Sequence, residues 1–355
     1  MKKIGILTFS ATTNYGSEAQ SYALCKALRN AGYDAELIDY HYAECDYNEE
    51  TISVKGLDSI IKKRYGTTEF YKFLWDRIIR QYYHNKFLKS TGVLSVKKYR
   101  INNIEETNRI YSIFMIGSDL VWDSKYCGDG YTFYLDFVDE NKYKFAYAAS
   151  CGNYSLNIQQ KEKTKQFLSC FDRILVREKQ LQEFLKKSMG MDSLTVADPT
   201  TLLENKEWEV FLGERIIKEP YVLVYMSDCH NKVIRFARSY AHRNNLKIVI
   251  VNDRNTKSLP SFLTHIWYAD MICTASYHGI LFSIYFQKKF AYVKRNPTNR
   301  IDQLEEVYSI LSQNIEYEGF DIDKEIEWKR IKNMECQYRE YSRKLLYEMV
   351  ENVYK

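Results

Sequence analysis

Short apolar runs alternate with amphipathic stretches along most of the chain. The first run, residues 3–9 (KIGILTF), is short, apolar and rich in isoleucine, which is typical of a buried parallel strand. A polar turn follows at 10–17, and residues 18–31 then carry apolar side chains at helical spacing up to Gly32. Residues 35–40 (AELIDY) form a second strand-like run. A strand, a helix and a strand within forty residues predict a parallel α/β sheet.

The same alternation continues to residue 311. Further strands are predicted at 111–116, 144–149, 174–177, 194–197, 221–226, 247–251, 271–274 and 290–293. Further helices are predicted at 158–171, 179–189, 232–244, 259–269, 279–286 and 301–311. The alternation restarts after Trp208, so the pattern predicts two doubly wound, Rossmann-like domains that face a cleft. Ligands of such sheets bind at the carboxyl ends of the strands.

The end of the chain has a different pattern. Apolar residues recur every three or four positions and form one stripe of a long helix: Ile331, Met334, Tyr338, Tyr341, Leu345, Met349 and Val353. We expect this helix to pack across both domains. The predicted division is therefore 1–205 for the N-terminal α/β domain, 206–320 for the C-terminal α/β domain and 321–355 for the C-terminal helix.

Composition narrows the function classes. The 355 residues are 45% hydrophobic and 27% charged, ordinary values for a soluble globular protein. No apolar run approaches the roughly 20 residues that span a bilayer, and the N-terminus lacks a signal-peptide pattern. The eight Cys show no metal-ligand spacing and suit reduced thiols in a cytoplasmic protein. A net charge of +5 is too small to indicate a nucleic-acid binder.

The first polar segment that could carry chemistry is the turn Thr13-Asn14-Tyr15-Gly16-Ser17, between the first strand and the first helix. Backbone N–H groups at such a helix start can bind an anion. The segment has one glycine and is not GxGxxG. From these residues alone, an Asn/Gly turn with Ser17 as the helix cap is the better interpretation.

The second segment, Ile116-Gly117-Ser118-Asp119-Leu120-Val121-Trp122, follows a predicted strand. Asp119 is a short acid that can hold a substrate hydroxyl, and the indole of Trp122 can stack on a sugar ring. A capped helix start explains the same residues equally well.

The third candidate is Arg177, which ends a predicted strand beside Glu178. A guanidinium there can form a fork with a carboxylate or phosphate. The alternative is an Arg177–Glu178 charge cluster on the surface, which is the commoner case for an arginine chosen at random.

The fourth candidate is Thr274-Ala275-Ser276-Tyr277-His278-Gly279, between a strand and an apolar helix. His278 lies at the predicted helix start, where the dipole favours a neutral imidazole. The residues alone fit a capping or core histidine better than a catalytic one. The other five His have no metal-ligand spacing, which makes a zinc site improbable.

Six of these segments, in this order, resemble the polysaccharide pyruvyl transferase family over most of residues 1–312. The matching pieces are KIGILTF with NYGSEAQSYALCKALRNAGYDAELIDY at 3–40, IGSDLVW at 116–122, AYAASCGN at 146–153, LVREK at 175–179, ADPTTLL at 197–203 and ADMICTASYHGILFSIYFQKKF at 269–290. The resemblance implies a GT-B-like fold and a cytoplasmic enzyme. It also implies that the enzyme can act as a peripheral protein at the inner membrane face. It implies transfer of the pyruvyl unit of phosphoenolpyruvate to a saccharide as a ketal, during bacterial surface polysaccharide synthesis.

The resemblance also implies roles for residues. His278 would be the acid/base residue, Arg177 would bind an anion, and Asp119 would complete the catalytic set. The expected substrate-binding residues are Asn14, Tyr15, Gly16, Ser118, Trp122, Ser276, Tyr277, Gly279, Lys294, Arg295 and Arg300. Phosphoenolpyruvate would be the donor substrate, and no cofactor, metal or nucleic acid is expected.

One position departs from the family pattern. Some members carry Arg two residues before this His, where the present chain has Ser276 followed by Tyr277. That change removes one expected cation for the donor. Lys294, Arg295 or Arg300 would have to supply the replacement charge.

Residues 60–100 form a basic segment within an expected helical insertion at about 55–100 of the acceptor-side N-terminal domain. The segment holds eleven bases and two acids, with aromatic residues interleaved. A solvated basic face explains the charge at least as well as any function. The functional hypothesis is contact with an anionic membrane that carries a lipid-diphosphate-linked acceptor. Two other functions stay open for the whole chain: a nucleotide-sugar glycosyltransferase and a non-catalytic glycan-binding protein.

Overall fold

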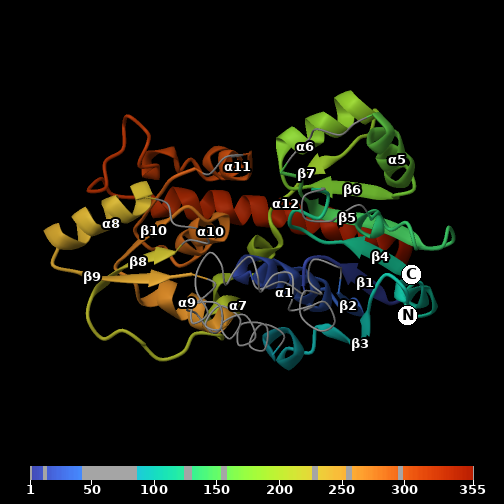
Figure 1. The fold of residues 1–355 in the computed structure, drawn as a ribbon, viewed down its shortest axis with the longest axis horizontal. Coiled ribbons are helices and arrows are strands. Elements are labelled where there is room, and N and C mark those ends of the chain that lie inside the picture. Colours follow the sequence, from blue (N-terminus) through green and yellow to red (C-terminus); the bar gives the residue numbers. More distant parts are fainter. Residues whose placement is uncertain are drawn as a thin grey trace, which may run out of the picture. The chain divides into compact units, whose positions relative to one another are not determined.

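The computed structural model describes residues 2–10, 14–41, 86–123, 130–152, 158–225, 231–252, 258–294 and 299–354 (Figure 1). The chain divides into two compact units. The first unit comprises Met1–Thr13, Ser17–Leu202 and Tyr341–Lys355, and the second comprises Asn14–Gly16 and Leu203–Glu340. The main division after Leu202 lies three residues before the sequence-based boundary, and the grouping of Asn14–Gly16 with the second unit was not anticipated.

The first unit is built on a seven-stranded sheet in which every strand pair is parallel. Its strands are β1 (Ile4–Leu7), β2 (Ala35–Tyr40), β3 (Leu94–Tyr99), β4 (Ile113–Ile116), β5 (Tyr143–Ala149), β6 (Arg173–Val176) and β7 (Leu194–Thr195). Their order in the sheet is β3-β2-β1-β4-β5-β6-β7. The order reverses between β1 and β4, and such a switch point is where doubly wound sheets bind ligands.

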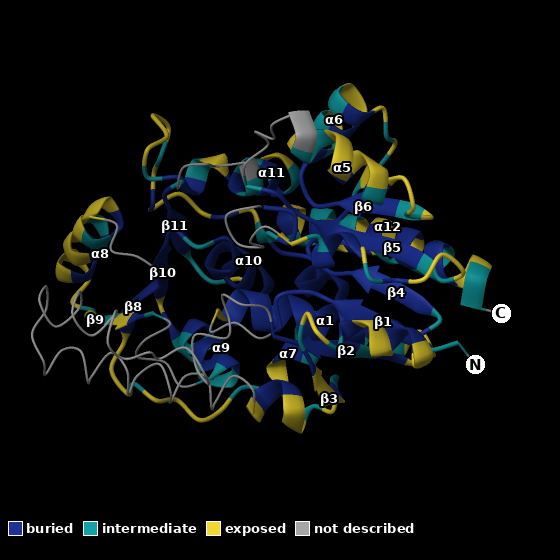
Figure 2. Ribbon diagram, turned by 45° about the vertical axis from the view of Figure 1, so that its right-hand side comes forward, coloured by how far each residue is buried: buried dark blue, intermediate teal, exposed yellow. Residues whose placement is uncertain are grey.

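The helices of the first unit cover this sheet. They are α1 (Tyr15–Asn30), α5 (Ile158–Leu168), α6 (Lys179–Phe184) and the last part of α12 (Trp328–Tyr354), with short turns at Ile104–Arg109, Thr132–Tyr134, Leu185–Met189 and Pro199–Leu202. The inner strands β1, β2, β4, β5 and β6 are buried along most of their length, whereas the edge strands β3 and β7 are more exposed. Helix α5 exposes its outer side (Figure 2). Runs such as Ile113–Ile116 are apolar throughout because both faces of a parallel sheet are covered.

The second unit has its own parallel sheet, ordered β11-β10-β8-β9. The strands are β8 (Tyr221–Tyr225), β9 (Lys247–Val251), β10 (Met271–Thr274) and β11 (Phe290–Tyr292). The helices are α7 (Asn205–Glu209), α8 (Asn231–Arg243), α9 (Leu259–Tyr268), α10 (Tyr277–Tyr285), α11 (Asn299–Tyr308) and the first part of α12, with a short turn at Leu311–Gln313. This sheet reverses between β8 and β10, so the carboxyl end of β10 is also a switch point.

The long C-terminal helix predicted from sequence is α12, and the structure divides it between the units at Tyr341. Ile331, Leu345 and Met349 are buried as the apolar stripe predicts. The prediction is wrong at Tyr341, which is 43% exposed. The buried face in the middle of α12 is polar instead, because Glu335 and Arg339 form a buried ion pair there.

The structure confirms the α/β class, with two parallel sheets and a long C-terminal helix. Most of the expected insertion at about 55–100 lies outside the described residues, which resume at Lys86 with a short helical stretch and β3. Within the part of the chain that the structure describes, no helix is both long and apolar enough to cross a membrane.

Candidate functional site

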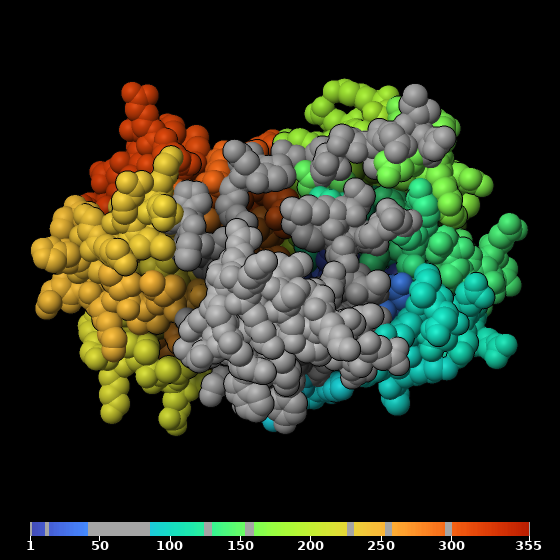
Figure 3. Space-filling view, viewed as in Figure 1, coloured from blue at the N-terminus to red at the C-terminus, as the bar shows by residue number. Residues whose placement is uncertain are grey.

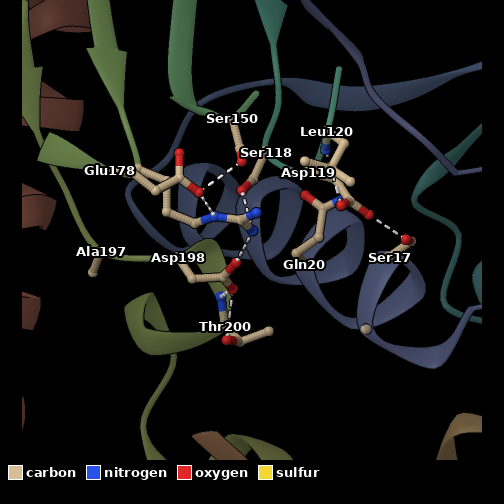
Figure 4. Close-up of polar contacts among 12 residues, drawn as sticks. Ser17, Gln20, Ser118, Asp119, Leu120, Ser150, Glu178, Ala197, Asp198 and Thr200 are labelled. Carbon is tan, nitrogen blue, oxygen red and sulfur yellow. Dashed lines mark hydrogen bonds and ion pairs between the residues drawn. The ribbon is translucent and has the colours of Figure 1, made fainter. Parts of the chain in front are cut away.

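Asp119 lies at the switch point of the first sheet, three residues after β4. Ser17 in α1 donates a hydrogen bond to Asp119 Oδ2, and the Leu120 N–H donates to Asp119 Oδ1 at 2.9 Å (Figure 4). Asp119 is 8% exposed. Each carboxylate oxygen therefore has a fixed donor on one side and can accept a further hydrogen bond from a ligand hydroxyl.

The backbone of Asp119 is strained. Its φ is +79°, in the left-handed region that residues with a Cβ rarely adopt. The Ser150 N–H donates to the Asp119 carbonyl at 3.1 Å, so the end of β5 holds this conformation. Strained residues persist where their surroundings hold them, and they concentrate at functional sites.

The turn between β1 and α1 differs from the sequence interpretation. Asn14 Oδ1 accepts the Gly16 N–H at 2.8 Å, so Asn14 caps α1 and the helix begins at Tyr15. Ser17, expected as the cap, instead uses its hydroxyl to bind Asp119. The capping prediction for Ser17 is wrong because the helix starts earlier than the apolar spacing indicated.

Arg177 follows β6 and is 1% exposed. It forms ion pairs with Glu178 and Asp198, and it donates to Ser118 Oγ at 3.2 Å. The surface-cluster alternative for Arg177 and Glu178 is therefore wrong, since both residues are buried. The sequence did not assign Asp198 to the site. Its position before Pro199 marked only a turn.

Trp122 lies in the core of the first unit. It is 3% exposed, its ring stacks on Tyr134 with centroids 5.9 Å apart, and its indole N–H donates to the Phe133 carbonyl. The edge of Phe171 covers it further. The expected stacking of Trp122 on a sugar is not possible in this conformation, because the neighbouring aromatic rings cover the indole.

His278 lies in the second unit, where β10 leads into α10 at the switch point of that sheet. The helix begins at Tyr277, and Ser276 is its N-cap, with Oγ accepting the Gly279 N–H at 3.4 Å. A Cβ on Gly279 would lie 2.5 Å from Thr274 Oγ1, so this junction requires glycine. The result is a tight turn that places His278 in the first turn of α10, where it is 6% exposed.

Gly16 packs against the imidazole of His278, and both residues belong to the second unit. A Cβ added to Gly16 would lie 2.0 Å from His278 Nδ1. Tyr15 fixes this approach by stacking on Phe262, with centroids 5.6 Å apart. The Tyr277 ring also meets the imidazole edge to face, with centroids 5.1 Å apart.

The three cations expected near the donor differ in their surroundings. Lys294 forms ion pairs with Asp302, at 2.7 Å, and with Glu305. Burial alone would lower the pKa of Lys294, but the two carboxylates outweigh it and raise that pKa. Arg300, half-buried in the first turn of α11, has no ion pair or hydrogen bond with a described residue. Arg295 lies outside the described residues.

The structure brings the candidates together in two groups. Ser118, Asp119 and Arg177 meet in the first unit, whereas Asn14, Tyr15, Gly16, Ser276, Tyr277, His278 and Gly279 belong to the second. Within the described ranges, no three His, Cys, Asp or Glu side chains lie close enough to share a metal ion.

A family model described as polysaccharide pyruvyl transferase matches residues 14–297. The chain belongs to this family. The family is one of transferases, and every candidate residue except Arg300 lies in the matched range. A search of curated proteins finds no match.

Several solved structures are similar to the chain. The UDP-GlcNAc 2-epimerase from Neisseria meningitidis bound to UDP-GlcNAc aligns with a TM-score of 0.50 and 10% identity, covering 99% of this chain and 100% of that chain. The epimerase from Methanocaldococcus jannaschii aligns with a TM-score of 0.47 and 12% identity, covering 96% and 93%. A spinosyn rhamnosyltransferase aligns with a TM-score of 0.40 and 8% identity, covering 99% and 96%. The first of these likenesses shows a shared, GT-B-like fold and nothing further.

Proposed function

We propose that this member of the family transfers the pyruvyl unit of phosphoenolpyruvate to a saccharide as a ketal, in the synthesis of a bacterial surface polysaccharide. The observation that carries the proposal is the family match over residues 14–297, with His278 at the strand-to-helix junction of the matched region. The proposal requires groups that move protons, bind an anion and hold a sugar diol.

The reaction balances with two hydroxyls and one donor. The methylene carbon of phosphoenolpyruvate takes up a proton and becomes a methyl group, and both sugar oxygens bond to the adjacent carbon. The bond from that carbon to the phosphate oxygen breaks. Of the two hydroxyl protons released, one balances the methyl group and the other leaves with phosphate. Two proton-handling groups therefore suit the site.

His278 is the proposed acid that protonates the methylene carbon. Its imidazole is held by Gly16 and Tyr277, and it sits at the carboxyl end of β10, where such sheets bind ligands. Asp119 is the proposed group that accepts a sugar hydroxyl. Its carboxylate is held by Ser17 and Leu120, so the remaining acceptor positions have a fixed direction.

Arg300 is the proposed cation for the donor in place of the missing family arginine. Lys294 is a poorer candidate because Asp302 and Glu305 already balance its charge. Arg300 has no such partner in the described part of the chain, and it lies near the positive end of α11.

We further propose that the basic segment contacts an anionic membrane that carries the acceptor. Near its described end, Val96 and Ile101 are 105% and 67% exposed beside Lys97, Lys98 and Arg100. Each base near an anionic surface contributes about 1 kcal/mol of attraction, which salt screens. Figure 3 shows side chains of the cyan range, which includes β3, at the surface.

Cosedimentation with phosphatidylserine vesicles tests this contact. We expect pelleting at low salt that fades as salt rises, and weaker pelleting when Lys62, Lys63 and Arg64 are changed to Glu. Changing the exposed Lys186 and Lys187 to Glu is the matched control and should leave pelleting unchanged. Equal pelleting of all three proteins would show that the basic segment does not contact the membrane and is an ordinary charged surface.

Phosphate release from phosphoenolpyruvate tests the reaction. The acceptors are methyl hexosides that carry a free diol, because a ketal needs two hydroxyls. We expect phosphate release only when a suitable diol is present. A UDP-hexose in place of phosphoenolpyruvate tests the glycosyltransferase alternative. Consumption of UDP-hexose without use of phosphoenolpyruvate would replace the proposal, and saccharide binding without either reaction would indicate a glycan-binding protein.

A further inference from the structure

A buried ionic network joins the carboxyl ends of four neighbouring strands in the first unit. Its centre is Arg177, whose Nε donates to Glu178 Oε1 at 3.1 Å and whose Nη1 donates to Asp198 Oδ2 at 2.8 Å. All three residues are at least 98% buried. Burying three charges is costly, and such a network often contributes less to stability than an apolar cluster of the same volume would.

Hydroxyl groups extend the network to the neighbouring strands (Figure 4). Arg177 Nη1 also donates to Ser118 Oγ, which follows β4, and Ser150 Oγ, which follows β5, donates to Glu178 Oε1 at 2.6 Å. Asp198 follows β7 and accepts both the N–H and the hydroxyl of Thr200. The ends of β4, β5, β6 and β7 are thus tied to one guanidinium.

Two of these ties flank Asp119. Ser118 precedes it in the chain, and Ser150 donates its N–H to the Asp119 carbonyl. Asp119 and Ala148 both have positive φ, +79° and +53°, and such residues cost about 1–3 kcal/mol each and persist only where the surroundings hold them. The network therefore surrounds the most strained part of the switch point.

The same geometry is unfavourable for direct binding of the donor by Arg177. The guanidinium is 1% exposed, so phosphate would need the network to open. The carboxylates of Glu178 and Asp198 already pair with this guanidinium, so an anionic donor would have to displace them to reach it.

We propose that Arg177 is a positioning residue that holds Asp119 in place through Ser118 and through the Glu178–Ser150 link. It does not bind the donor. This inference rests on the proposed function, in which Asp119 accepts the sugar hydroxyl. It differs from the anion-binding role that the family resemblance implies for Arg177.

The kinetic test is Arg177→Lys, which keeps the charge but loses the planar fork that reaches two carboxylates and a hydroxyl. A displacement of about 1 Å at a catalytic group can cost on the order of 100-fold in rate. We expect a fall of that order in kcat, with the donor KM within about twofold of wild type. Arg173→Gln, at the opposite end of β6, is the control and should leave both parameters unchanged. A raised donor KM with unchanged kcat would overturn the proposal in favour of direct binding.

Ser118→Ala tests the route without removing a buried charge. It deletes the hydroxyl between Arg177 and the β4 loop, so we expect a smaller fall in kcat. Combined with Arg177→Lys, it should add little, because both changes break one path. Fully additive effects of the two substitutions on kcat would contradict the proposed path.

Hydrogen exchange separates this proposal from the proposed reaction. The amides of 117–122 and 149–152 should exchange faster in Arg177→Lys than in wild type or Arg173→Gln. If the wild-type enzyme fails to use phosphoenolpyruvate but this exchange accelerates, the reaction is wrong and the positioning of Asp119 stands. Unchanged exchange in Arg177→Lys would overturn the positioning role whatever the reaction is.

Discussion

In the first unit, charges and hydrogen bonds hold Asp119, whereas in the second unit the shape of its neighbours holds His278. Around Asp119, a guanidinium, two carboxylates and several hydroxyls converge from different strand ends. Around His278, the backbone of Gly16 and the Tyr277 ring leave little space. The first region should therefore be sensitive to changes of charge, and the second to changes of volume.

The largest effect is expected from His278→Ala, which removes the proposed acid. General acid–base groups contribute about 10²–10⁴-fold in rate, so kcat should fall by that amount. The melting temperature should stay within a few degrees, because alanine suits the first turn of α10. Turnover with phosphoenolpyruvate and thermal unfolding check both points. His265→Ala in α9 is the control, and activity of His278→Ala within a few-fold of wild type would refute the role.

Removal of the central charge from the first unit should destabilise the fold. Arg177→Met leaves Glu178 and Asp198 buried without their cation, and breaking a buried pair in this way costs about 3–5 kcal/mol. Urea unfolding should show that loss in the free energy of unfolding. Arg173→Met, at the first residue of β6, should cost far less. Equal losses of unfolding free energy in the two variants would mean that the buried network contributes no more to stability than a partly exposed arginine.

A methyl group should suffice to disturb the second region. In Gly16→Ala, the new Cβ would lie 2.0 Å from His278 Nδ1, so the imidazole or the first turn of α1 has to move. We expect kcat to fall on the order of 100-fold, as for a misplaced catalytic group. Gly213→Ala is a matched control in the same unit, since its new Cβ meets Thr264 Oγ1 at an ordinary 3.7 Å. Equal activity of both variants would show that the close contact is unimportant.

The smallest effect is expected from a change of Arg300, the cation proposed to bind the donor. Arg300→Gln should raise the KM for phosphoenolpyruvate about tenfold, because a hydrogen bond to a charged group contributes about 1.5–3 kcal/mol. Lys294→Gln should change it much less, since Asp302 and Glu305 already occupy that ammonium group. Initial-rate kinetics against donor concentration decide between them. The reverse ranking would move the donor site toward Lys294.

The sequence predicted the repeating strands and helices because each apolar run must be buried against a neighbour. It missed β3, whose residues LSVKKY at Leu94–Tyr99 are mostly polar. This strand lies at the edge of the sheet, and a two-residue irregularity opposite Leu37 and Asp39 turns Val96 outward, so the usual alternation is lost. Local patterns carry little information about such an edge.

Some residues of the candidate site could be predicted from the sequence and others could not, again because local patterns do not show contacts between distant segments. His278 and Asp119 could be found because both follow predicted strands, and position at a strand end is a local property. The distant partners of Arg177 could not be found, since Ser118 and Asp198 lie 59 and 21 positions away and meet it only in the folded sheet. The same holds for Ser150, which binds Glu178 across 28 positions. Trp122 was misjudged for the same reason, because its cover, Tyr134, belongs to a turn that no periodic pattern marks.

The most direct measurement is nuclear magnetic resonance of the product formed from ¹³C-labelled phosphoenolpyruvate in heavy water, with methyl hexosides that carry a free diol. The account predicts a quaternary ketal carbon on the sugar, a methyl group that carries one deuterium, and one phosphate released per ketal. Phosphoenolpyruvate that stays unchanged across the whole set of diols, or that yields only free pyruvate and phosphate, would contradict it.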